Sequence, residues 1–148
     1  MNEKAKSDFV QAEALLLSLD VQCTGQAFHG KHAWYELHNS LKSYFVGTAH
    51  SLETNGKKVL QMNRPPIFLQ RPNHSITIVG IERTTSGKCR LLTFDPAWRP
   101  PAMMAEELTT VKMPGWRRKY LLSRYRKGQR YLKRYKNFET LSVDQPDT

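Results

Sequence analysis

The sequence predicts an α+β domain whose helices pack against an antiparallel or mixed central sheet. Two stretches, 8–19 and 32–45, place apolar residues at the three- and four-residue spacing of amphipathic helices. Two runs rich in β-branched residues, 75–83 and 89–94, are separated only by the polar loop 84–88. Because a parallel crossover needs a dozen or more residues, these two strands must be antiparallel.

The N-terminal part is predicted as helix, strand and helix. Ser7 or Asp8 can cap the first helix, since both side chains accept hydrogen bonds from a free backbone N–H. Residues 21–28 are typical of a short strand, and Gly47 ends the second helix. A further short strand is predicted at 59–62 and a turn at Arg71-Pro72-Asn73, both before the central hairpin.

The chain after the hairpin is predicted to be mostly helical. Asp95-Pro96 ends the second hairpin strand, because proline cannot continue a central strand. A helical stretch is expected from about Met103 to Lys136, with an interruption at Pro114-Gly115 and a basic helix over 116–136. Residues 138–143 are predicted as a final strand.

Size and composition indicate one intracellular domain, 1–148. The 148 residues include no apolar run of membrane-span length, and the polar start is unlike a secretory signal. We therefore expect a cytoplasmic or nuclear protein without a membrane partner. Cys23 and Cys89 lack the paired spacing of a zinc site, so we expect free thiols, no metal and no cofactor.

The net charge of +10 comes from one segment. Residues 117–136 carry no carboxylate and hold ten cations: Arg117, Arg118, Lys119, Arg124, Arg126, Lys127, Arg130, Lys133, Arg134 and Lys136. Such a segment can attract nucleic acid or an acidic protein surface. Its tyrosines recur at helical spacing, which also fits an ordinary solvated basic helix packed on the core.

The hairpin predicts a contact between His74 and Asp95. His74 stands just before the first hairpin strand and Asp95 just after the second, so the hairpin brings them side by side. A carboxylate bonded to one imidazole nitrogen leaves the other free as a general base, which is two-thirds of a nucleophilic triad. The alternative is structural, because Asp before Pro is a common turn residue. Gln70, four residues before His74, is either an oxyanion donor or a solvent-facing turn residue.

Four segments carry a resemblance to a known family: Pro66–Gln70, Asn73–Ser75, Ile78–Glu82 and Leu91–Pro96. Together they resemble the ubiquitin-fold-modifier-specific cysteine peptidases, most closely the zinc-finger ubiquitin peptidase branch and its fungal members, and the resemblance spans about residues 15–143. It implies a papain-like cysteine-peptidase half-domain that acts on ubiquitin or a ubiquitin-like modifier. By the same resemblance His74 is the catalytic histidine, Asp95 its orienting acid and Gln70 an oxyanion residue.

Two departures from the family pattern concern catalysis. Some branches place the histidine directly after Asp-Pro, where this chain has Ala97, so only the ubiquitin-type arrangement fits. The family's nucleophilic cysteine lies more than a hundred residues before the histidine, whereas 73 residues precede His74. We therefore expect a fragment or a shortened pseudoenzyme, inactive alone, with Cys23 as the only alternative nucleophile worth testing. The competing hypothesis is a non-catalytic module that binds a ubiquitin-like protein or nucleic acid.

Overall fold

The computed structural model describes residues 3–46, 63–102, 104 and 113–145. The predicted strand at 59–62 and most of the predicted helix near residue 103 lie outside these residues. No helix of the described part is long and apolar enough to cross a membrane. In chain order the elements are α1 (Glu3–Ser18), β1 (Cys23–His29), α2 (Ala33–Val46), β2 (Ile67–Arg71), β3 (His74–Arg83), β4 (Cys89–Phe94), α4 (Gly115–Ser123), β5 (Arg126–Gly128), α5 (Gln129–Leu132) and β6 (Asn137–Val143).

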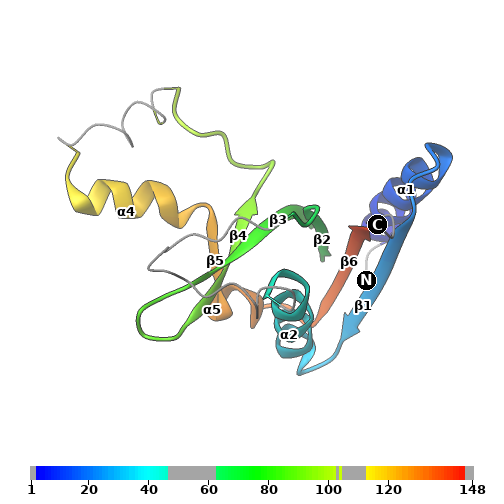
Figure 1. Cartoon of the computed structure of the whole chain (residues 1–148), viewed down its shortest axis with the longest axis horizontal. Helices are drawn as coiled ribbons and strands as arrows, with labels where there is room; N and C mark the ends of the chain where they lie inside the picture. The colour runs from blue at the N-terminus through cyan, green and yellow to red at the C-terminus, as the bar shows by residue number, and fades with distance from the viewer. Residues whose placement is uncertain (1–2, 47–62, 103, 105–112, 146–148) are drawn as a thin grey trace.

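The strands form one six-stranded sheet in the order β1-β6-β2-β3-β4-β5 (Figure 1). Each pair of neighbours is antiparallel, which confirms the α+β class and decides between the antiparallel and mixed alternatives. The last strand, β6, lies between β1 and β2, so the C-terminal part of the chain joins the first strand to the central hairpin.

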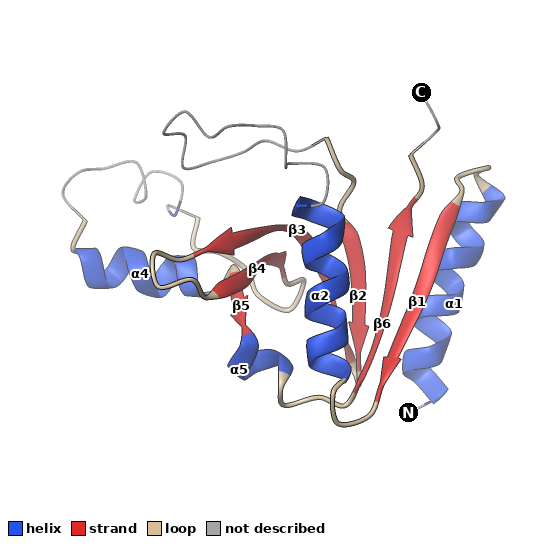
Figure 2. Cartoon of the chain, turned by 60° about the horizontal axis from the view of Figure 1, so that its bottom comes forward, coloured by secondary structure: helices blue, strands red, loops and turns tan. Residues whose placement is uncertain are grey.

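The two N-terminal helices lie on opposite faces of the sheet (Figure 2). Ser40 of α2 donates a hydrogen bond to Gln26 of β1, whereas Phe9 of α1 lies beside the neighbouring Gly25. Because successive residues of a strand point to opposite faces, these contacts place α1 and α2 on different sides. The buried core lies on the α2 side and consists of Ala33, Leu37, Leu41, Phe45, Ile67, Leu69, Ile76, Ile78, Leu91, Leu132 and Phe138.

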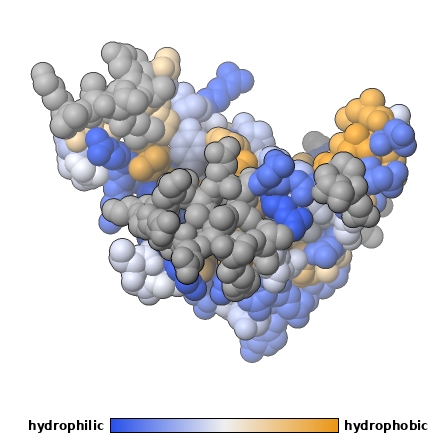
Figure 3. Space-filling view, viewed as in Figure 1, coloured by the Kyte–Doolittle hydropathy of each residue, from blue (hydrophilic) through white to orange (hydrophobic). Residues whose placement is uncertain are grey.

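The helices predicted at 8–19 and 32–45 are both confirmed. In α2 the buried residues Ala33, Leu37, Leu41 and Phe45 recur every four residues, as a helix that buries one stripe requires. Helix α1 begins earlier than predicted, at Glu3. An apolar region lies over α1 in Figure 3. The exposed apolar residues of α1 and of the residue that follows it are Val10, Leu15, Leu17 and Leu19.

Two tight connections fix the central hairpins, and both were predicted. Strands β2 and β3 are joined by Pro72 and Asn73, and Asn73 adopts a positive φ of 63°, which asparagine tolerates better than most residues. The loop between β3 and β4 contains Gly87 at φ 79°, and Thr84 accepts a backbone hydrogen bond from Lys88. The strands predicted at 21–28 and 138–143 are confirmed as β1 and β6.

The helical segment predicted over 116–136 is confirmed only in part. The segment forms α4, then the short strand β5, then the single turn α5. Strand β5 pairs with the outer edge of β4, with Lys127 opposite Leu91. The residues of Arg126–Gly128 do not by themselves favour a strand. The segment is extended because its backbone forms hydrogen bonds with the outer edge of β4.

The position of Phe138 in the core generates a stability prediction. Phe138 is fully buried on the central strand β6, so Phe138→Ala should lower the free energy of unfolding by about 3–5 kcal/mol. Phe94→Ala is the matched control, because the Phe94 side chain is 56 % exposed, and we expect about 1 kcal/mol or less. Urea unfolding measures both values. Equal losses in the two variants would contradict the described core.

Candidate active site

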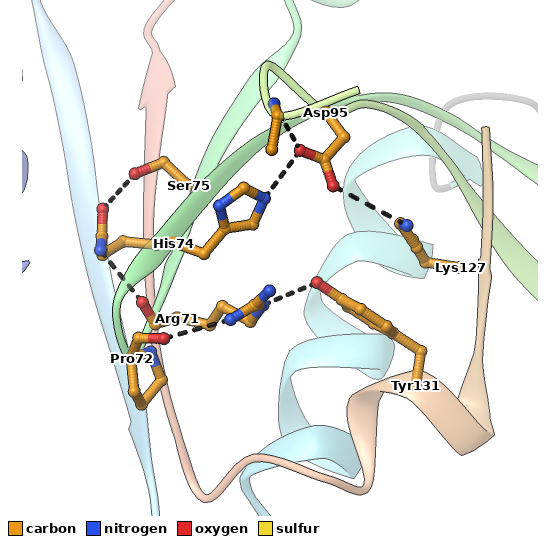
Figure 4. Close-up of polar contacts among 9 residues, drawn as sticks. Arg71, Pro72, His74, Ser75, Asp95, Lys127 and Tyr131 are labelled. Atoms are coloured by element: carbon orange, nitrogen blue, oxygen red, sulfur yellow. Dashed lines mark hydrogen bonds and ion pairs between the residues drawn. The ribbon is translucent and has the colours of Figure 1, made fainter. Parts of the chain in front are cut away.

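His74 and Asp95 touch across the β3–β4 hairpin. The Nε2 atom of His74 lies 2.7 Å from Oδ1 of Asp95 (Figure 4). Both side chains are largely buried, with exposed fractions of 19 % for His74 and 15 % for Asp95. The contact predicted from the sequence is therefore present.

A β-bulge determines that the two side chains meet. Near the hairpin loop Arg83 pairs with Cys89, but after the register shift between Ile78 and Gly80 the ladder pairs Thr77 with Phe94. One residue beyond that pair, Asp95 lies opposite Ile76. Its side chain is therefore on the same sheet face as the side chain of His74. Without the shift Asp95 would fall opposite Thr77, whose side chain points to the other face.

The orientation of the imidazole leaves one nitrogen available. Because Nε2 faces the carboxylate, the neutral ring carries its proton on Nε2 and donates it to Asp95. Nδ1 is then an acceptor, and no hydrogen bond to it is present among residues 3–46, 63–102, 104 and 113–145. This nitrogen is suited to accept a proton from an approaching nucleophile.

Asp95 is held as a carboxylate. Burial alone would raise the pKa of the Asp95 carboxyl, but the Ala97 N–H, His74 and Lys127 outweigh burial and hold that pKa below its ordinary value. The Ala97 N–H donates to Oδ1 at 2.9 Å, and the Lys127 ammonium lies 3.9 Å from Oδ2. Asp95 therefore stays ionised at every pH at which histidine titrates.

Lys127, Tyr131 and Arg71 form a second layer around the pair (Figure 4). The Lys127 ammonium lies 4.9 Å from the centre of the Tyr131 ring, and the Tyr131 hydroxyl accepts a 2.7 Å hydrogen bond from Nε of Arg71. The Arg71 guanidinium in turn lies 4.4 Å from the centre of the Tyr135 ring. Burial lowers the pKa of Lys127, and Asp95 counteracts that effect. The approach of Lys127 to Asp95 could not be predicted from the sequence, because it depends on the pairing of strand β5 with β4.

Gln70 lies on the other face of the hairpin from His74. Gln70 pairs with Ser75, and Arg71 pairs with His74, so strand alternation separates the two pairs. The Gln70 amide accepts a hydrogen bond from the Ser75 hydroxyl and donates one to the Arg71 carbonyl oxygen. Gln70 is buried, so its interpretation as a solvent-facing turn residue is wrong. The structure does not bring Gln70 and His74 together, and its oxyanion role stays a prediction.

Neither cysteine lies near His74. Cys23 is on β1, three strands away from β3 and about five residues along the sheet, which amounts to roughly 20 Å. Burial, and then the carboxylates of Glu13 and Asp144, raise the pKa of the Cys23 thiol, which disfavours the reactive thiolate. Cys89 stands at the opposite end of β4 from Asp95, also about 20 Å away. The described fold does not bring Cys23 and His74 together, and Cys23 as the nucleophile stays an untested prediction.

The other histidines within the described ranges, His29, His32 and His38, do not gather into a metal-binding cluster. His29 contacts Asn137 through its Nδ1 atom at 3.2 Å. In the part of the chain that the structure describes, no three His, Cys, Asp or Glu side chains cluster as a metal site would require.

The depressed pKa of Asp95 predicts a pH-dependent contribution to stability. That contribution is fully present above the unfolded-state pKa near 3.8 and is lost as the pH falls through the lower folded-state pKa. We expect Asp95→Asn to lower the free energy of unfolding by about 1–3 kcal/mol at neutral pH, because it weakens a charge-assisted hydrogen bond. The difference from the unmodified protein should shrink below about pH 4.

Urea unfolding at a series of pH values measures that difference. Asp20→Asn is the control, because it removes an exposed carboxylate and changes the net charge equally. A stability difference for Asp95→Asn that stays constant from pH 7 to pH 2 would contradict the ionised contact.

Comparison with known proteins shows what this chain is similar to. The chain is similar to the zinc finger-containing ubiquitin peptidase 1 of Mus musculus, with 39 % identity over 83 residues, and to that of Bos taurus, with 35 % over 82 residues. Each match covers 55 % of this chain and 14 % of the relative, so the matched segment is a small part of those proteins. The crystal structure of UfSP from C. elegans aligns with a TM-score of 0.46 and 15 % identity, over 90 % of this chain and 21 % of that one.

A family model matches nearly the whole chain. The profile described as "Peptidase family C78" matches residues 10–141. This match confirms the resemblance to thiol peptidases of ubiquitin-like modifiers that the sequence motifs indicated. The chain belongs to peptidase family C78.

Proposed function

We propose that this chain forms the histidine–aspartate part of a thiol peptidase that releases ubiquitin or a ubiquitin-like modifier from its conjugates. The observation that carries the proposal is the 2.7 Å contact between His74 and Asp95, which leaves Nδ1 of His74 without a partner among the described residues. Family membership and the ubiquitin peptidases among the relatives support the choice of substrate class.

In this mechanism His74 is the general base. Nδ1 of His74 takes the proton of a cysteine thiol, and the thiolate attacks the carbonyl carbon of the bond that joins the modifier to its target. The imidazolium then gives its proton to the leaving amine, and a thioester remains. Water, deprotonated by His74, hydrolyses the thioester and restores the thiol. Throughout, Asp95 fixes the ring orientation and stabilises the imidazolium.

Lys127 is proposed as a positioning residue for Asp95. One carboxylate oxygen is held by the Ala97 N–H and His74, and the ammonium of Lys127 faces the other. These contacts limit rotation of the carboxylate, so the hydrogen bond to Nε2 keeps its direction. The Tyr131 ring contacts the Lys127 ammonium, and the hydrogen bond from Arg71 to the Tyr131 hydroxyl holds that ring in place.

The nucleophilic thiol is proposed to come from outside residues 1–148. The sequence holds two cysteines, and neither lies near His74: Cys23 is roughly 20 Å away, and Cys89, which pairs with Arg83 at the far end of β3, is roughly 30 Å away. The segment that carries the thiol belongs either to a longer form of this chain or to another chain. We propose a cytoplasmic or nuclear site of action, because reduced thiols persist in those compartments.

The first test is hydrolysis by residues 1–148 alone. Ubiquitin and ubiquitin-like modifiers that carry a fluorogenic C-terminal amide should not be cleaved above the buffer rate, because no thiol reaches Nδ1. Cys23→Ala should give the same result. Cleavage that disappears in Cys23→Ala would contradict both the placement of Cys23 and the proposed source of the nucleophile.

The second test is binding of the modifier. We expect unlabelled ubiquitin or a ubiquitin-like modifier to shift amide resonances of the isotopically labelled chain around 71–75 and 95–97, where a substrate's C-terminal tail must pass to reach His74. A modifier that lacks its C-terminal tail is the control and should leave these resonances unchanged. A map without shifts for every intact modifier would contradict the proposed function.

A further inference from the structure

A basic groove lies between α2, the β3–β4 hairpin and the β5–α5 turn. Its volume is about 790 Å³. The groove is bounded by three separate stretches of chain, which lie within residues 34–42, 83–90 and 128–133. None of the residues of the His74–Asp95 site borders it.

The charge of the groove is entirely positive. Its lining has no carboxylate and six cationic side chains: Lys42, Arg83, Lys88, Arg90, Arg130 and Lys133. The carboxylate of Glu82, which does not line the groove, forms ion pairs with two arginines. Its oxygens lie 2.8 Å from a guanidinium nitrogen of Arg126 and 4.0 Å from one of Arg90. Cations stand on the α2 side, on the hairpin side and on α5, so a single anionic chain in the groove could contact all three.

Aromatic rings accompany these cations. The Tyr35 side chain is 54 % exposed, and its ring meets the ring of Trp34 edge to face at 5.7 Å. The ammonium of Lys133 lies 4.7 Å from the centre of the Trp34 ring, a cation–π contact that joins α5 to α2. Tyr35 therefore offers a fixed aromatic surface beside a row of cations.

We propose that this groove binds single-stranded nucleic acid. Grooves that hold single strands combine cations, which follow the phosphates, with aromatic rings on which unpaired bases stack. The bases of a duplex are already stacked and paired, so a duplex would gain nothing from Tyr35. An acidic protein surface would pair with the cations but has no unpaired base to stack on the exposed ring. The groove differs from the basic segment 116–136, because only two of its six cations, Arg130 and Lys133, come from that segment.

Binding is tested with the full chain and a fluorescent oligothymidylate of about 15 nucleotides, followed by anisotropy at several salt concentrations. Lys42→Gln/Lys88→Gln removes two exposed cations from facing sides of the groove. We expect weaker binding and a slope of log K against log salt that falls in magnitude by about 1.4, since each phosphate contact to a single strand contributes about 0.7. Tyr35→Ala should weaken binding by about tenfold without altering the salt slope.

The matched control is Arg99→Gln/Lys119→Gln, which lowers the net charge equally at exposed positions outside the groove. It should keep the affinity and the slope of the unmodified chain. Equal losses in the control and the groove variant would overturn the proposal, because only overall charge would then matter. Binding of a duplex as tight as that of the single strand, or full competition by polyglutamate, would also overturn it. Circular dichroism of each variant verifies that the fold is retained.

Discussion

The candidate active site depends on one hydrogen bond, from Nε2 of His74 to the carboxylate of Asp95. The two residues are 21 positions apart in sequence and meet only because β3 and β4 pair as an antiparallel hairpin. Within that hairpin the register shift between Ile78 and Gly80 turns Asp95 to the face on which His74 lies. A local irregularity of the sheet therefore creates the chemical pair on which the proposed reaction relies.

The rest of the sheet keeps the Asp95 carboxylate ionised and holds the pair in its orientation. Strand β5 adds Lys127 to the edge of β4, and α5 adds Tyr131, which receives the hydrogen bond of Arg71 from β2. Three strands and one helical turn thus contribute to one partly buried cluster with a single carboxylate at its centre. The basic groove uses the other side of the same β5–α5 turn through Arg130 and Lys133, so one short basic segment serves two surfaces with different chemistry.

Much of the fold could be predicted from local patterns. The stripe of α2, the turn at Pro72-Asn73 and the polar loop at 84–88 are signals that a short window of sequence contains, and each is confirmed. The contact of His74 with Asp95 also followed from the hairpin. Strand β5 could not be predicted, because Arg126–Gly128 becomes extended only where the edge of β4 offers hydrogen bonds. The positions of Lys127 near Asp95 and of Gln70 on the opposite face depend on that tertiary pairing and on strand parity, which no local pattern encodes.

The central claim is that Asp95 holds the neutral imidazole of His74 in the Nε2–H form, and nitrogen-15 NMR of the histidine side chains tests it most directly. Long-range proton–nitrogen correlations at a pH where His74 is neutral should show a protonated Nε2 and an unprotonated Nδ1. Asp95→Ala should return the ring to an averaged mixture of the two tautomers. An Nδ1–H form in the unmodified chain, or a spectrum that does not change in Asp95→Ala, would contradict the account.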